Sequence, residues 1–144
     1  MDRLTPSERS ANMRAIKGRD TKPEILIRSM LHRMGFRFRL HAKDLAGRPD
    51  VVFRRRRKAI FVHGCFWHRH QGCSKAYRPK SRADFWNAKL DANRQRDLRV
   101  QTALSELGWS ILVVWECEAV DSEHLRNNLR RFVELGEPNG GHGD

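Results

Sequence analysis

The chain has 144 residues, enough for one domain with a single hydrophobic core, and its 29 Lys and Arg against 17 Asp and Glu give a formal net charge of +12. With 39% hydrophobic and 32% charged residues, the composition is typical of a globular chain and excludes a disordered one. No window approaches the roughly 20 apolar residues that a membrane span needs, which excludes a membrane protein. The start of the chain also lacks the apolar core of a signal peptide, so we expect a cytoplasmic protein. Its cationic surface favours nucleic acid as the partner.

Helix start signals, apolar spacing and glycine stops predict the elements in chain order. They are a helix over 5–17, a helix over 21–34 ended by Gly35, strands over 36–40, 50–53 and 59–63, a helix over 81–106 ended by Gly108, a strand over 109–116, and a helix over 122–135. The alternating strand 36–40 is expected to be half buried, and the apolar run 109–116 is typical of a central strand buried on both faces. The order predicts an α/β fold, with a mixed central sheet flanked by helices.

Asp50 stands at the first residue of a predicted strand, directly after Gly47-Arg48-Pro49. Cleavage of a phosphodiester bond needs a metal that polarises the phosphate and activates water, and a carboxylate at a rigid strand start suits that task. Aspartate is also a common turn residue, so a purely structural role for Asp50 stays open here.

The next strand offers an unusual partner set for Asp50. Nucleases of the restriction type carry an acid-x-Lys motif there, whereas this chain has Phe61-Val62-His63, so a metal would need other oxygens, such as the Val62 carbonyl. His63 and His68 are candidates to hold water or to act as general base. Glu24 is a further candidate, although a Glu at the third position of a capping box already has a structural role.

The three cysteines are an odd number in a chain without a secretion signal, which argues against a disulfide framework. Together with one histidine they supply the four soft ligands of a closed structural zinc site: Cys65, His70, Cys73 and Cys117. The segment 64–80 lacks apolar residues with which to pack, so a metal would be its simplest tether. Buried free thiols are the alternative.

Two aromatic pairs, Phe66-Trp67 and Phe85-Trp86, stand among basic residues. Such pairs can stack on bases or wedge between them, while core packing is the alternative, favoured for Phe85. The run Arg54–Arg57 is either a solvated turn or, on a hairpin next to Asp50, a set of phosphate contacts.

Five segments together resemble the very short patch repair (Vsr) DNA mismatch endonucleases, in the order and spacing of that family. They are NMRAIKGRDTKPE (12–24), GRPDVVF (47–53), FVHGCFWH (61–68), FWNAKLDANRQRD (85–97) and LGWSILVVWEC (107–117). The resemblance implies a restriction-endonuclease-like fold with a zinc-stabilised loop. It also implies a Mg-dependent nick 5′ to the thymine of a T:G mismatch that deamination of 5-methylcytosine has produced.

The resemblance further implies a role for each matching residue. Asp50 would bind magnesium, together with the Val62 carbonyl. The other catalytic residues, which would hold metal-bound waters or the scissile phosphate, are Glu24, His63, His68 and Asp97, with His68 as the general base. The structural zinc would be bound by Cys65, His70, Cys73 and Cys117. The mismatch would meet a wedge of Phe66, Trp67 and Trp86, and contacts from Met13, Lys89 and Asn93.

Two positions depart from the family pattern. Val62 stands where the family often has Thr, which a backbone ligand tolerates, and the spacing from His70 to Cys73 is one residue longer, which makes His68 the substitute fourth zinc ligand. Two other functions stay open: a restriction-type endonuclease that cuts unmismatched duplex, and a non-catalytic zinc-stabilised DNA-binding module.

For the organisation of the chain we expect an N-terminal DNA-contacting arm over 1–20, an endonuclease domain over 21–135 and a disordered tail over 136–144, which has four glycines and a proline. The expected partners are double-stranded DNA with a T:G mismatch and other mismatch-repair proteins. We expect a monomer that works at the nucleoid in the bacterial cytoplasm.

Overall fold

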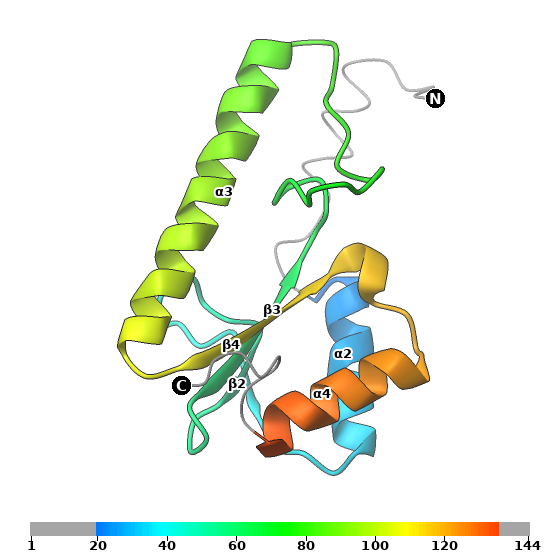
Figure 1. The fold of residues 1–144 in the computed structure, drawn as a ribbon, viewed down its shortest axis with the longest axis vertical. Coiled ribbons are helices and arrows are strands. Elements are labelled where there is room, and N and C mark those ends of the chain that lie inside the picture. The colour runs from blue at the N-terminus through cyan, green and yellow to red at the C-terminus, as the bar shows by residue number, and fades with distance from the viewer. Residues whose placement is uncertain (1–19, 136–144) are drawn as a thin grey trace.

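The computed structural model describes residues 20–135 of the chain (Figure 1). Its elements are α2 (Lys22–Arg33), β1 (Arg39–Leu40), β2 (Val51–Phe53), β3 (Lys58–His63), α3 (Ala83–Glu106), β4 (Ser110–Trp115), the 3₁₀ turn η1 (Glu116–Glu118) and α4 (Glu123–Leu135). The predicted mixed α/β architecture is confirmed. The predicted helix 5–17 and the tail 136–144 lie outside the described residues. Within residues 20–135 every helix is too short or too polar to cross a membrane.

The sheet has four strands in the order β1-β2-β3-β4, and it is mixed. β1, β2 and β3 pair antiparallel, whereas β3 and β4 run parallel, with Lys58 opposite Ser110 and His63 opposite Trp115. Parallel neighbours need a long crossover, and α3 supplies it. Because the two strands pair along their whole length, they also end together.

Two predicted strands differ from the structure. β4 was expected at the centre of the sheet but is an edge strand, and only Val114 in it is fully buried, because its other side has no paired strand in the described chain. The predicted strand 36–40 shrinks to Arg39–Leu40 because its partner β2 has only three residues. Phe38 and Phe36 still pack edge-on against Phe53, at ring centroid distances of 5.9 and 6.3 Å.

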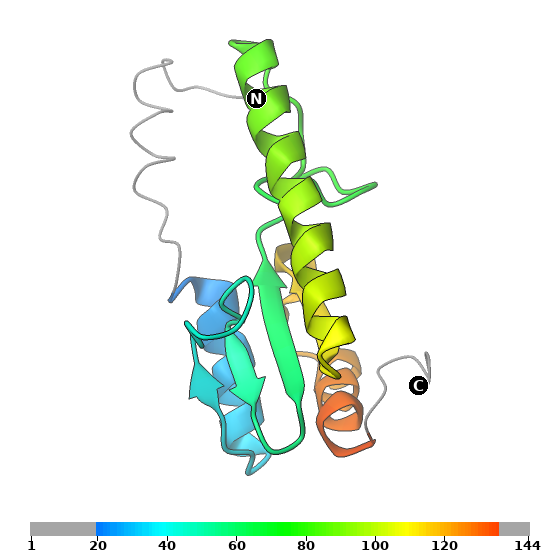
Figure 2. The same ribbon diagram turned by 90° about the vertical axis from the view of Figure 1, so that its left-hand side faces the viewer.

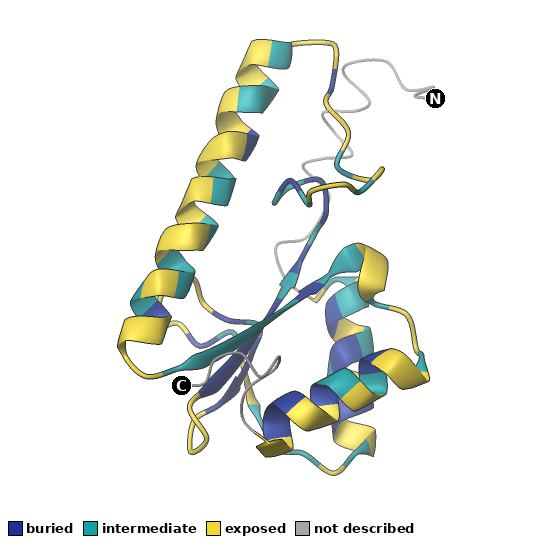
Figure 3. Ribbon diagram, viewed as in Figure 1, coloured by how far each residue is buried: buried dark blue, intermediate teal, exposed yellow. Residues whose placement is uncertain are grey.

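Helices cover both faces of the sheet, but unequally. Figures 1 and 2 show α2 and α4 on one face and α3 on the other. The main core cluster joins α2 and α4 to the strands and includes Ile27, Ile60 and Phe132, while no described residue of α3 belongs to it. Figure 3 shows the buried residues gathered on the α2 and α4 side, and α3 largely exposed where it runs beyond the sheet. The α3 face of the sheet is therefore the one on which polar side chains can gather.

The basic hairpin turn lies away from Asp50 and is exposed, which favours the first of its two predicted roles, a solvated turn. β2 begins directly after Asp50 and runs into the turn Arg54–Arg57, so Asp50 and the turn lie at opposite ends of the strand. Arg54 pairs with Asp44, with its Nη2 2.6 Å from Oδ1, and Arg56 and Arg57 donate to the carbonyl oxygens of Val133 and Leu107. The turn therefore links the β2–β3 hairpin to Asp44, to α4 and to the end of α3.

Candidate active site and cysteine cluster

Asp50 and His63 come to the same end of the sheet because β2 and β3 are antiparallel. Asp50 directly precedes β2, His63 is the last residue of β3, and the Val62 N–H donates to Asp50 Oδ2 at 2.7 Å. Side chains alternate along a strand: Ile60 and Val62 pack on the core cluster, whereas Phe61 and His63 belong to the other face. Phe61, His63 and also Val62 line a cleft on the α3 side. Strand geometry thus points His63 toward α3.

This cleft has a volume of about 570 Å³ and contains all five predicted catalytic residues. They come from four parts of the chain: Glu24 from α2, Asp50 and His63 from the sheet, His68 from the following segment, and Asp97 from α3. Exposed cations also line it, namely Lys43, Arg48 and Arg96. Their charge favours an anionic ligand such as a phosphate.

His68 is held from two sides. Its Nδ1 lies 2.5 Å from Asp97 Oδ2, and its ring stacks on that of His63 with centroids 3.9 Å apart and planes 2° apart. A carboxylate only accepts hydrogen bonds, so Asp97 places the proton on Nδ1 and leaves Nε2 as the free base. This is the arrangement that orients a general base in other enzymes.

Burial shifts the pKa values of two cleft residues in opposite directions. Burial raises the pKa of Asp50 to about 7, with the Glu24 charge adding to the rise and the Val62 N–H opposing it. Burial lowers the pKa of His63 to about 4, and neighbouring His68 lowers it further. His63 is therefore neutral at pH 7, which allows the close stacking on His68. Its buried Nδ1 has no hydrogen-bond partner within residues 20–135, so a ligand or water can satisfy it.

Glu24 lies in the capped first turn of α2 and also lines the cleft. Thr21 caps α2 by accepting from the Glu24 N–H at 3.4 Å, while Glu24 Oε1 accepts from the Asp20 N–H at 2.8 Å and from Arg28 Nη2 at 3.1 Å. Arg28 Nη2 also lies 3.1 Å from His41 Nε2, and His41 lines the cleft. Arg28 and His41 were not predicted. The four-residue spacing from Glu24 could have identified Arg28, whereas His41 joins only through tertiary packing.

Gly47 sets the distance between α3 and the loop before Asp50. Its φ is +73°, and a Cβ there would come within 2.5 Å of a methyl group of Val100 on α3. Only glycine combines this left-handed backbone with so close an approach. The motif that begins at Gly47 therefore brings Asp50 and Asp97 to opposite walls of one cleft.

The four predicted zinc ligands converge because β3 and β4 end together. Cys65 lies two residues beyond His63, and Cys117 lies two residues beyond Trp115, the partner of His63 in the parallel register. His70 Nδ1 lies 3.6 Å from Cys65 Sγ and 3.4 Å from Cys117 Sγ, and the His70 ring stacks on Trp115 at 4.1 Å. One atom from each of Cys65, His70, Cys73 and Cys117 lies within 4.8 Å of the others.

The thiol chemistry of this cluster suits a soft cation. Burial raises the pKa of Cys65 to about 12 and raises that of Cys117, whereas the Lys75 N–H lowers the pKa of Cys73. Without a cation, the buried Cys65 thiol therefore keeps its proton. Three sulfurs and one imidazole are a ligand set typical of structural zinc, whose charge stabilises thiolates. His68, the proposed substitute ligand, is instead engaged with Asp97.

One aromatic cluster lies between the 64–82 segment and the start of α3. It consists of Phe66, Trp67, Tyr77, Phe85 and Trp86. Phe66 is at its centre, 5.2 Å from Trp67, 5.0 Å from Tyr77 and 5.7 Å from Trp86. Phe66 is buried, Trp67 and Trp86 are half-buried, and Phe85 and Tyr77 are exposed. Core packing, the role favoured for Phe85, is therefore wrong. Tyr77 was not predicted, because a single aromatic residue in an irregular segment carries no periodic signal.

The predicted mismatch contacts on α3 lie close to this cluster. Asn93 Nδ2 donates to the Trp67 carbonyl at 3.3 Å, so α3 contacts the 64–82 segment directly. Lys89 is exposed nearby on the same helix. Met13 lies outside the described residues.

The fold and this cleft define a class of α/β proteins with clustered acids and histidines at a sheet end, and comparison with known proteins identifies the family. The family model described as "DNA mismatch endonuclease Vsr" matches residues 1–75. The chain is 50% identical to the type II nicking enzyme V.XorIIP of Xanthomonas oryzae, over 92% of this chain and 97% of that protein. It is 43% identical to DNA mismatch endonuclease Vsr of Escherichia coli, over 87% of this chain and 83% of that protein.

A third relative is the type II nicking enzyme V.NmeAIP of Neisseria meningitidis, 42% identical over 92% of this chain and 94% of that protein. The chain belongs to the Vsr DNA mismatch endonuclease family, as the sequence motifs predict.

The raised pKa of Asp50 gives a stability prediction. In the unfolded chain Asp50 loses its proton near pH 3.8, but in the folded protein only near pH 7, so burying this group destabilises the folded state increasingly as pH rises through that window. Asp50→Asn keeps an acceptor for the Val62 N–H and removes the titration. In urea unfolding of protein without added magnesium, the stability gained by the variant should grow by roughly 2 kcal/mol from pH 5.5 to pH 8. A gain that does not change with pH would contradict the raised pKa.

Proposed function

We propose that this protein nicks one strand of duplex DNA on the 5′ side of the thymine in a T:G mismatch that arises from deamination of 5-methylcytosine. The observation that carries the proposal is the His68–Asp97 pair, stacked on neutral His63 in the cleft that holds Asp50. The names of the relatives, a DNA mismatch endonuclease and nicking enzymes, support the same reaction. We also propose that the reaction depends on magnesium.

His68 takes the proton of the attacking water in this mechanism. Asp97 accepts from Nδ1, so the unprotonated Nε2 is left for the water, and the stacked His63 ring fixes the plane of the imidazole. As the water oxygen bonds to phosphorus, its proton moves to Nε2 and the bond from phosphorus to the leaving oxygen breaks. The leaving oxygen keeps the electron pair of that bond and takes a proton from solvent water. A positioned base of this kind contributes about 10²–10⁴-fold to a rate.

Asp50 is the residue best suited to hold the magnesium. Mg²⁺ prefers oxygen ligands and keeps several of its waters, so one carboxylate and one backbone carbonyl, here Asp50 and Val62, are a sufficient protein share. When bound, the ion would supply positive charge next to the scissile phosphate. Asp50 Oδ2 already accepts from the Val62 N–H, which fixes the carboxylate toward the cleft. Glu24, which lines the same cleft, is held by Arg28.

The cysteine cluster would bind structural zinc through Cys65, His70, Cys73 and Cys117. This would join the ends of β3 and β4 to the 64–82 segment, which otherwise has few buried apolar residues. Since that segment carries His68 and the aromatic cluster, zinc would hold both the base and the DNA-contacting rings in place.

Mismatch selectivity would come from the aromatic cluster. A T:G pair is easier to unstack than a matched pair, so rings that insert next to it convert that difference into preference. Trp67 and Trp86 are half-buried rings held by buried Phe66 and by the Asn93 contact to the Trp67 carbonyl. They are therefore rigid and still accessible. Lys89 and Asn93 would contact the mismatched pair from α3.

The function predicts selective nicking. Duplexes that differ only in carrying T:G, T:A or C:G at one position should be compared with magnesium and after its removal, by strand separation on denaturing gels. The T:G duplex should be nicked 5′ to the thymine, only with magnesium. His68→Ala should lower the rate by roughly a hundredfold because the base is lost, while duplex binding persists. Equal nicking of T:A and T:G would instead establish a restriction-type nuclease, and binding without any nicking would establish a DNA-binding module.

The zinc proposal predicts one zinc per chain by elemental analysis of purified protein. Cys117→Ala should lose the metal and melt at a lower temperature, because structural zinc binding is coupled to folding. Ser74→Ala, at an exposed neighbour of Cys73, is the control and should keep both. Zinc-free wild-type protein with the same melting temperature would refute the proposal.

The aromatic wedge predicts a loss of selectivity without a loss of general affinity. Trp86→Ala should retain salt-dependent binding to matched duplex but lose most of the preference for T:G, since stacking is worth about 1–3 kcal/mol per base. Trp86→Phe keeps a ring and should retain part of the preference. Both are measured as the ratio of binding constants for T:G and T:A duplexes. An unchanged ratio in Trp86→Ala would mean that this ring only packs within the protein and does not contribute to the preference for T:G.

A further inference from the structure

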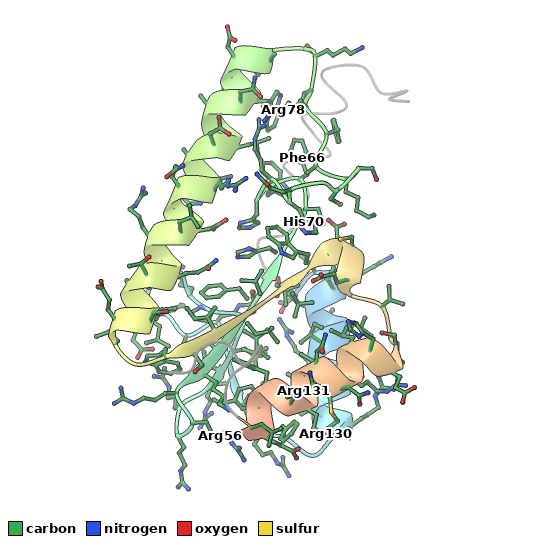
Figure 4. The ribbon with its side chains drawn as sticks, in the orientation of Figure 1. Arg56, Phe66, His70, Arg78, Arg130 and Arg131 are labelled. Atoms are coloured by element: carbon green, nitrogen blue, oxygen red, sulfur yellow. The ribbon has the colours of Figure 1, made fainter. Side chains whose placement is uncertain are left out.

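A second cleft, of about 600 Å³, lies between the 64–82 segment and α3, apart from the catalytic cleft. Three arginines line it, Arg69, Arg78 and Arg94, and we call it the arginine cleft. The one carboxylate among its lining residues belongs to Asp91. Figure 4 shows Arg78 and His70 beside the part of α3 that runs beyond the sheet, at the opposite end of the molecule from Arg130 and Arg131.

Arg69 is the fixed part of this cleft. It is only 8% exposed, and its Nη2 donates to Asn87 Oδ1 at 2.6 Å. Its Nε is buried without a hydrogen-bond partner in the described chain and lies 3.4 Å from Asp91 Oδ1, on a side chain that is 62% exposed. A buried guanidinium with an unused donor is costly unless a ligand completes its hydrogen bonds.

The other two arginines add charge without adding acceptors. Arg78 Nη1 donates at 3.0 Å to the same Asn87 Oδ1 that Arg69 uses, so two cations share one neutral oxygen. Arg94 faces the amide of Gln71, whose oxygen accepts from Arg94 Nη1 at 2.9 Å. Three guanidinium groups thus have two neutral amides and one exposed carboxylate as partners. This surplus of donors and of positive charge fits an anion with several oxygens, which guanidinium forks bind in pairs of hydrogen bonds.

We propose that the arginine cleft binds backbone phosphates of the DNA substrate outside the scissile position. The proposal rests on the proposed function in taking duplex DNA as the ligand. Asn87, Asp91 and Arg94 follow at spacings of four and three, so they share one stripe of α3, whereas Lys89 and Asn93 form a different stripe. The cleft therefore lies on another side of α3 from the proposed mismatch contacts, and its contacts position the duplex without reading its bases.

The test compares Arg78→Gln and Arg94→Gln with Arg130→Gln, and their double variant with Arg130→Gln/Arg131→Gln. Arg130 and Arg131 are exposed arginines of α4 at the far end of the molecule (Figure 4), so each control loses the same charge as the variant it is matched to, but away from the cleft. Binding to T:G and matched duplexes is measured without magnesium over a salt series, after melting curves have shown that each variant folds. The double variant should bind both duplexes roughly tenfold more weakly, with a salt slope reduced by about 0.9 per lost phosphate contact. Arg130→Gln should stay close to wild type.

Three outcomes would overturn the proposal. The first is a double variant that binds like Arg130→Gln/Arg131→Gln, which would leave only a general effect of charge. The second is a loss confined to the T:G duplex, which would make the cleft part of mismatch recognition. The third is stabilisation of the wild type, but not of the double variant, by inorganic phosphate while duplex binding is unchanged, which would indicate a site for free anions. Because binding is measured without magnesium, failure of the wild type to nick would refute the proposed function and leave this comparison valid.

Discussion

β3 and β4 pair in parallel with His63 opposite Trp115, and the geometry of the site depends on this register. His63 ends its strand facing α3 and enters the cleft, while the next residues of both strands leave the sheet side by side. Cys65 and Cys117 meet for that reason, and His70 stacks on Trp115 between them. A shift of one residue would turn His63 to the core face and separate the two thiols. The β3–β4 pairing thus positions both His63, on which the proposed general base His68 stacks, and the proposed zinc ligands.

The long helix α3, with 24 residues, contacts both the cleft and the segment that carries the aromatic cluster. Where it covers the sheet, Val100 packs against Gly47, and Asp97 enters the cleft and binds His68. Where it runs beyond the sheet, it holds the 64–82 segment through Asn93 and Asn87. A helix is stiff, so the aromatic cluster and the catalytic cleft keep a fixed separation. The distance from the mismatch to the cut bond would then be set by the protein and not by the DNA.

The charge of the site contrasts with that of the chain. The protein carries +12 overall, yet burial favours a protonated Asp50 and a neutral His63 at the centre of the cleft. Cations stand at its rim, including Lys43 and Arg96. Such a cleft attracts phosphate from a distance, and a bound cation of the proposed kind would favour the ionised form of Asp50, since an isolated charge is costly in a low-dielectric interior. Glu24 differs from Asp50 in having a cationic side chain beside it, that of Arg28.

The sequence alone determined the order of the described elements, the family and the five acidic and histidine residues that meet in one cleft, because these depend on local signals and specific motifs: a capping Thr21, the glycine after each helix, and Asp50 before its strand. Tertiary structure decided what those signals do not contain. It made β4 an edge strand, took the basic turn away from Asp50, buried Phe66 while exposing Phe85, and added Arg28 and His41 to the site. Strand order and helix packing join residues far apart in the chain, and hydrophobic periodicity reports only that a side chain is apolar, not which neighbour covers it.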